Sequence, residues 1–124
     1  MKHDLLSDTL SIINNAERVG KTQCIVPASK FVKTVLDVIS VSGYIGSIEP
    51  EKNSFVVKLL GKINKIHVVR PRFSIQKNEF DSWEQRYLPS KDTGVLIIST
   101  PKGIMNQKEA AKKGTGGKIV AYVY

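Results

Sequence analysis

The chain has 124 residues, of which 41% are hydrophobic, and its 19 basic against 11 acidic residues give a formal net charge of +8. This length can bury a core as one compact domain or as two small modules that need each other. The charge favours a polyanionic partner such as nucleic acid or a lipid surface. No stretch approaches the roughly 20 apolar residues of a membrane span, and acids interrupt the apolar patch of MKHDLLSDTL, which excludes a secretory signal. We therefore expect a soluble, cytoplasmic protein.

The first predicted element is a helix over residues 4–18, ended by Gly20, because apolar residues recur on one helical face: Leu6, Leu10, Ile13 and Ala16. A short β-branched strand over residues 22–26 follows. Ser29 is suited to the N-cap of a second helix, which Gly43 ends.

Three strand-like runs come next, YIGSIE, SFVVKLL and INKIHVVR. The polar turn PEKN separates the first two, which predicts a hairpin. We expect the third run to pair with the second. Pro71 then interrupts the pattern, so we place a module boundary at residue 70, with an N-terminal module over 1–70 and a C-terminal module over 71–124.

The C-terminal half predicts a strand restart at 72–76, a short helix or turn over 79–87, a strand over 94–100, a helix over 106–114 and a last strand over 116–124. The aromatics of EFDSWEQRY share one face, which favours a core position over a base-stacking platform. The fold class is therefore α+β: an N-terminal α/β module, ordered helix, strand, helix, strand, strand, packed on a C-terminal β-rich module with short helices.

The motif STPKG, which ends the strand over 94–100, invites comparison with a phosphate-binding loop. A nucleotide-binding P-loop needs glycines before its lysine and a hydroxyl residue after it. Here Gly103 follows Lys102, and Pro101 removes a backbone amide. The motif therefore does not predict nucleotide hydrolysis.

Metal and nucleophile chemistry have few candidate residues. Cys24, the single cysteine, lies in the apolar run TQCIV and is expected to be a buried small hydrophobe. His3 and His67 have no second ligand at a metal-binding spacing, and no nucleophile, base and orienting group recur at a known spacing. We expect no enzyme, no metal, no cofactor and no small-molecule substrate.

Two basic intervals, residues 52–77 and the segment after Asp92, carry most of the excess charge. They could be solvated surfaces, and no amphipathic helix suits them to a membrane. The short hydroxyls of Ser99 and Thr100 suit the wide, shallow minor groove of RNA. Lys102 adds a charge for phosphate. These residues favour RNA binding.

The segment STPKGIMNQKEAAKKGTGGKIVAYVY closely resembles the C-terminal signature of the universal small-subunit ribosomal protein number eight. The resemblance extends over the whole chain through HDLLSDTLSIINNA, VPASK, SGYIG, RPRFSI and RYLPSKDTG. The insert over 83–89 is similar to archaeal and eukaryotic members, and Lys102 with AYVY favours archaea. Two departures are Pro101, where the family usually has serine, and Leu5, where it commonly has proline.

The resemblance implies a protein of the small ribosomal subunit that binds a helix of the central domain of the small-subunit rRNA and helps to assemble the platform beside neighbouring ribosomal proteins. A free-standing RNA- or DNA-binding regulator on the same scaffold stays open as the alternative. The resemblance also implies the RNA contacts. They are Ser99, Thr100, Lys102 and Gly103 in the signature loop, Gly116, Gly117 and Lys118 in the glycine pair and its neighbour, and Asn15 and Lys30 as positioning contacts.

Overall fold

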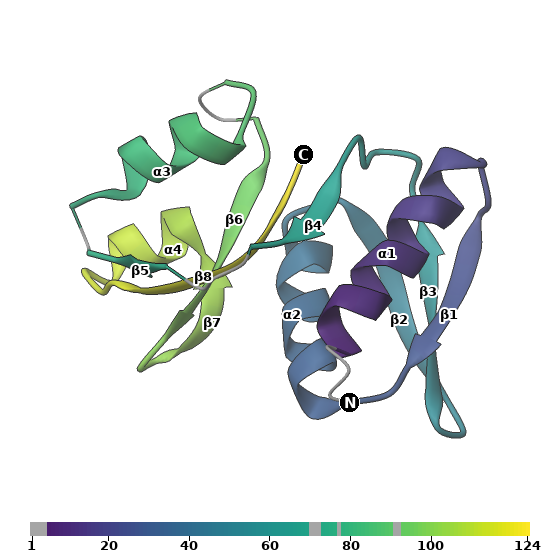
Figure 1. Ribbon diagram of the computed structural model, residues 1–124. Helices are drawn as coiled ribbons and strands as arrows, with labels where there is room; N and C mark the ends of the chain where they lie inside the picture. Colours follow the sequence, from purple (N-terminus) through teal and green to yellow (C-terminus); the bar gives the residue numbers. More distant parts are fainter. Residues whose placement is uncertain (1–4, 70–72, 77, 91–92) are drawn as a thin grey trace.

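The computed structural model describes residues 5–69, 73–76, 78–90 and 93–124. Along the chain its elements are α1 (Leu5–Arg18), β1 (Gln23–Pro27), α2 (Lys30–Val41), β2 (Ile45–Glu51), β3 (Ser54–Leu59), β4 (Ile66–Val68), β5 (Ser74–Ile75), α3 (Phe80–Tyr87), β6 (Val95–Thr100), β7 (Gly103–Asn106), α4 (Gln107–Lys112) and β8 (Gly117–Val123) (Figure 1). The predicted α+β class is confirmed.

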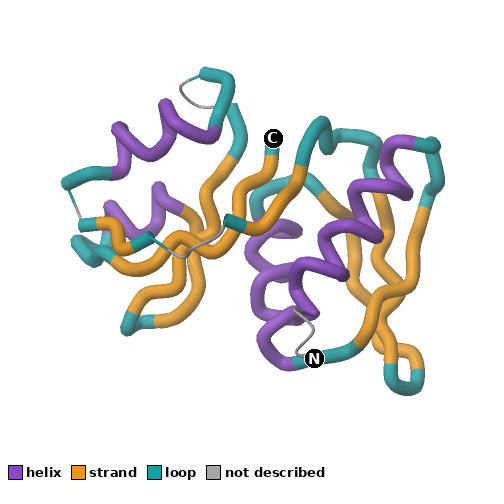
Figure 2. Tube along the Cα trace, viewed as in Figure 1, coloured by secondary structure: helices purple, strands orange, loops and turns teal. Residues whose placement is uncertain are grey.

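The described strands form two antiparallel sheets. The first has the order β1-β3-β2, and the second, which we call the C-terminal sheet, has the order β4-β8-β6-β7, with β5 also paired to β8. The C-terminal sheet lies between α1 and α2 on one side and α3 and α4 on the other (Figure 2). Because β8 pairs with β4, β5 and β6, it is the strand on which this sheet is built.

The helix boundaries follow the signals in the sequence. The four apolar residues predicted to share one face of the first helix are all buried in α1. Ser29 is the N-cap of α2, although its side chain makes no capping hydrogen bond. The Asn106 side chain accepts a hydrogen bond from the backbone N–H of Glu109 at 2.8 Å, so Asn106 caps α4 at the start of the helix predicted over 106–114.

The predicted pairing of INKIHVVR with the preceding strand is wrong. The strand within this run, β4, pairs with β8, so that Ile66 lies opposite Val123. The reason is that β3 is the central strand of its sheet, and β1 and β2 already occupy both of its edges. The predicted module boundary at residue 70 lies outside the described residues and stays a prediction.

Two hydrophobic clusters hold the sheets together. The larger joins α1, α2 and the first sheet to one face of the C-terminal sheet, through residues such as Ile13, Ile39 and Ile97. The smaller packs α3 and α4 on the opposite face of the C-terminal sheet, around Leu96 and Ile119. Since the larger cluster includes residues from both sheets, each sheet depends on the other for a complete core.

One residue of α1 is a polar exception inside the larger core. Thr9 is fully buried, and its hydroxyl has no hydrogen-bond partner among the described residues. We expect Thr9→Val to raise the free energy of unfolding by about 1 kcal/mol, because valine keeps the shape and removes an unsatisfied polar group. Urea unfolding measures this change. Thr34→Val is the control, since the exposed Thr34 hydroxyl donates to the Lys30 carbonyl, and a loss of stability in Thr9→Val would contradict the expectation.

Candidate nucleic-acid interface

The signature loop is a tight turn that joins β6 to β7. Thr100 and Gly103 are cross-strand partners, so only Pro101 and Lys102 connect the two strands. The Thr100 hydroxyl donates to the Gly103 carbonyl at 2.7 Å and accepts from the Lys102 N–H at 3.1 Å. Gly103 has φ +124°, which side chains of L residues rarely adopt. Thr100 therefore stabilises the turn, and its hydroxyl hydrogen is already used inside the protein.

Ser99 lies at the centre of a row of side chains at this end of the C-terminal sheet. Its cross-strand partners are Lys118 on β8 and Ile104 on β7, and Lys118 in turn lies opposite Ser74 on β5. Cross-strand partners present their side chains on the same face, with Cβ atoms about 5 Å apart. Ser99 is half-buried, and its hydroxyl bonds to no group in the described part of the chain. The row therefore presents an available hydroxyl beside an ammonium group.

Gly117 explains why Lys118 comes so close to Ser99. A Cβ on Gly117 would overlap the carbonyl oxygen of Ser99 and lie 2.9 Å from its carbonyl carbon. Only a residue without a side chain lets β8 begin against the end of β6. The resemblance implied that Gly117 brings the backbone close to RNA. In the structure, Gly117 allows β8 to approach the end of β6 closely.

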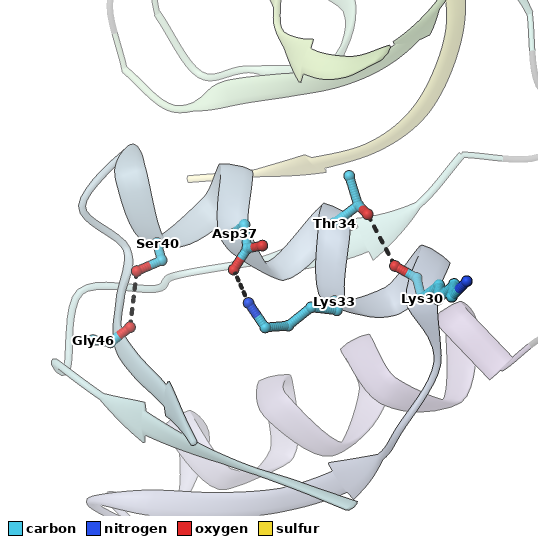
Figure 3. A network of polar contacts seen from close by, with 6 residues as sticks. All are labelled: Lys30, Lys33, Thr34, Asp37, Ser40 and Gly46. Carbon is cyan, nitrogen blue, oxygen red and sulfur yellow. Dashed lines mark hydrogen bonds and ion pairs between the residues drawn. The ribbon is translucent and has the colours of Figure 1, made fainter. Parts of the chain in front are cut away.

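Lys30, at the start of α2, lies on the same side of the molecule as this row. The Thr34 hydroxyl donates to the Lys30 carbonyl at 2.9 Å, one helical turn away (Figure 3). Thr34 lines an open pocket of about 220 Å³ with Ile104, the cross-strand partner of Ser99. Lys33 forms an ion pair with Asp37 at 2.6 Å. By contrast, Lys30 has no ion-pair partner among the residues that the structure describes.

Asn15 lies apart from these residues. It lines a groove of about 650 Å³ between the C-terminal half of α1 and the edge strand β1, and its side-chain oxygen accepts from Arg18 at 3.5 Å. In Figure 1 this end of α1 and the β6–β7 turn lie on opposite sides of the molecule. The structure thus places the N-terminal part of α2, through Thr34, beside Ile104 of β7, whereas Asn15 lies on another face.

The charge around the loop is positive. The nearby Glu109 forms an ion pair with Lys113 at 3.5 Å. Lys102 and Lys118 are exposed and have no ion-pair partner in the described ranges.

Burial raises the pKa of the Cys24 thiol, with Glu17 adding to the shift, so Cys24 stays protonated and unreactive at neutral pH.

Two other kinds of feature are missing from the residues that the structure describes. These residues contain no group of three His, Cys, Asp or Glu side chains that could hold a metal ion. None of the helices in these ranges has the length and apolar character needed to cross a membrane.

The family model described as Ribosomal protein S8 matches residues 4–124. The chain belongs to the ribosomal protein S8 family. A similar relative is the small ribosomal subunit protein uS8 of Methanococcoides burtonii, which is 45% identical over 126 aligned positions that cover 98% of this chain and 97% of the relative. This relative comes from an archaeon, in agreement with the archaeal type that the signature predicts. Ribosomal protein S8 is a structural protein and not an enzyme, so the expected structural, non-enzymatic role in the small ribosomal subunit is confirmed.

Sequence reasoning missed Ser74 as a neighbour of the S8 signature loop. It lies in RPRFSI, one of the segments that carry the family resemblance. Its place opposite Lys118 depends on the register of β5 with β8. A pairing between residues 44 positions apart leaves no local signal in the sequence.

Proposed function

We propose that the chain binds a helix of the central domain of the small-subunit rRNA and helps to assemble the platform of that subunit. As a member of the S8 family, it is a structural constituent of the small ribosomal subunit in the cytoplasm, with rRNA and ribosomal proteins as its partners. The proposed contact surface consists of Ser99, Lys102, Gly103 and Lys118 on the C-terminal sheet, with Lys30 on α2. Gly116, Gly117 and Thr100 support it, and Asn15 would make a separate contact.

The observation that carries this proposal is the Ser99 hydroxyl, which has no hydrogen-bond partner among the described residues. It lies opposite Lys118 and next to the turn that carries Lys102, which the Thr100 hydroxyl stabilises. A short hydroxyl can donate to and accept from the 2′-OH groups and base edges of an RNA minor groove. The two ammonium groups suit phosphates on either side of that groove. Because Thr100 holds the turn in one conformation, little conformational entropy is lost when RNA binds.

The proposal is tested by a mobility-shift titration of the protein against a short central-domain rRNA helix and a scrambled hairpin of equal length and charge. A preference of about a hundredfold, on the order of 3 kcal/mol, would support specific recognition. Equal affinity for both would contradict it. Co-sedimentation with small subunits through a high-salt wash separates a ribosomal constituent from a free-standing regulator.

Ser99→Ala is expected to weaken binding to the rRNA helix by about 1 to 2 kcal/mol, because a buried RNA group then loses its hydrogen-bond partner. Binding to the scrambled hairpin should not change. The control is Ser11→Ala, which removes an exposed hydroxyl on α1. If Ser99→Ala binds the helix as the wild type does, Ser99 is not a contact.

Lys102→Gln is expected to act through charge. It should weaken binding to both RNAs and reduce the slope of log K against log salt by about 0.7 to 0.9, the change expected when one lysine–phosphate interaction is removed. The matched control is Lys52→Gln in the β2–β3 turn, an exposed lysine far from the loop. Equal salt slopes for wild type and Lys102→Gln would remove Lys102 from the interface.

A further inference from the structure

A row of aromatic rings crosses the opposite end of the C-terminal sheet. His67 on β4 and Tyr122 on β8 are cross-strand partners, with ring centroids 6.3 Å apart. The ring of Tyr87, the last residue of α3, lies 5.3 Å from that of Tyr122. These rings border an open pocket of about 360 Å³, which we call the β4 pocket, lined by Lys65, His67, Val68, Val69, Tyr87 and Tyr122.

The walls of the β4 pocket are supported from behind. Trp83 stacks on Tyr87, with ring centroids 6.2 Å apart and an interplanar angle of 7°. The ring centroids of Phe73 and Trp83 are 5.2 Å apart. The guanidinium of Arg86 lies 5.1 Å from the centroid of the Trp83 ring. Tyr87 and Tyr122 are half-buried against the smaller hydrophobic cluster. The rings are therefore held in place, while part of their surface stays accessible to a ligand.

Aromatic faces can receive either a planar base or a cation, so the charge around the pocket decides between them. Lys65 is exposed at the rim and has no ion-pair partner among the described residues. No acidic side chain lines the pocket in the described part of the chain, and the sequence has no acid between Glu51 and Glu79. Lys65 would repel a lysine or arginine side chain and attract a phosphate.

We propose that the β4 pocket binds one unpaired base of RNA, stacked on Tyr122 and Tyr87, with Lys65 on a flanking phosphate. Base stacking on aromatic residues and a cation for the backbone are the general features of single-strand recognition. The pocket volume lies within the range of about 300 to 1,000 Å³ found for small-molecule sites. The inference rests on the proposed function, because it takes RNA to be the ligand.

The β4 pocket is separate from the signature loop. Tyr122 and Lys118 are four residues apart on β8, which corresponds to roughly 13 Å along a strand. The two surfaces could therefore contact a paired helix and a neighbouring unpaired nucleotide of the same RNA. The β4 pocket would thus give an RNA-binding role to aromatic residues that are not part of the proposed contact surface around Ser99.

The test is a fluorescence anisotropy titration of the full chain with labelled pentaadenylate, beside an abasic sugar–phosphate pentamer of equal charge. The emission of Trp83, the single tryptophan, reports on the location of binding. The RNA should quench this emission and bind more tightly than the abasic pentamer. Tyr122→Leu should weaken pentaadenylate binding by about 5- to 100-fold, whereas Tyr122→Phe, which keeps the ring, should not.

A second variant does not depend on core packing. Lys65→Gln changes an exposed residue and should reduce the salt slope for pentaadenylate by about 0.7, whereas Lys52→Gln should leave it unchanged. Equal affinity for RNA and abasic pentamer would overturn the inference. So would an unchanged slope in Lys65→Gln, unchanged affinity in a folded Tyr122→Leu variant, or quenching of Trp83 by pentaarginine but not by RNA.

The two proposals can fail separately. Ser99→Ala should leave pentaadenylate affinity unchanged, because Ser99 lies at the other end of the sheet. Preference for the rRNA helix without pentaadenylate binding would overturn the β4 pocket alone. Pentaadenylate binding with these variant effects, but without preference for the helix, would support the pocket and overturn the proposed central-domain function.

Discussion

Gly94→Ala is expected to lower the free energy of unfolding by about 4 kcal/mol, the largest change that we predict for a single methyl group. Gly94 has φ +90°, where an L side chain is strained. A Cβ at this position would also lie 2.5 Å from the Val123 carbonyl oxygen and 2.7 Å from the Tyr124 Cβ. The backbone of β8 would have to move away from β6, which it pairs along its length.

Urea unfolding, followed by circular dichroism, measures this loss, since small single domains usually unfold in one transition. Gly61→Ala is the matched control. Gly61 has φ +72°, but no heavy atom lies within 4 Å of its added Cβ, so only the backbone strain of about 1 kcal/mol applies. If the two variants lose the same stability, the close contact with Val123 does not matter.

Gly117→Ala is expected to lower the free energy of unfolding by about 3 kcal/mol through the overlap with Ser99. It has a second consequence. Relief of the overlap moves Ser99 away from Lys118, so the variant should also bind the rRNA helix at least 1 to 2 kcal/mol more weakly, about the effect of losing the Ser99 hydroxyl. Stability is measured by urea unfolding and affinity by mobility shift under conditions in which the variant is folded.

The control for Gly117→Ala is Gly46→Ala in β2. An added Cβ at Gly46 lies 3.2 Å from the Lys58 Cβ, its nearest neighbour, so a small adjustment removes the overlap. We expect a loss of about 1 kcal/mol or less and unchanged RNA affinity. A Gly117→Ala variant that unfolds and binds RNA like Gly46→Ala would contradict the close approach of β8 to β6.

Local signals in the sequence were enough to predict the helices. The apolar face of α1, the stop at Gly20 and the cap at Asn106 each depend on residues within a few positions of one another. Strand pairing depends on residues far apart, and here prediction was less successful. β4 was assigned to the wrong partner, and β7 was not predicted because its four residues, GIMN, show no clear alternation.

In the candidate site, too, the residues could be named from the sequence, but their long-range arrangement could not. The resemblance named Ser99 and Lys118, but only the register of β6 with β8 shows that they lie opposite each other. The sequence could not show that the Thr100 hydroxyl is used within the turn. The aromatics of α3 were assigned to the core, and Phe80 is buried there. Trp83 and Tyr87 are half-buried against the same cluster, and His67 and Tyr122 extend their row into an open pocket.

The central place of β8 has a consequence for the order of events during synthesis. Every strand that pairs directly with β8 precedes it in the chain, and Val120, Ala121 and Val123 complete the larger hydrophobic cluster. Until these residues are free to fold, β4 lacks its partner, β6 is paired only with β7, and the apolar faces of α1 and α2 lack part of their cover. Exposed strand edges and apolar surfaces favour aggregation. A growing chain that still lacks β8 is therefore expected to aggregate more readily than the complete fold.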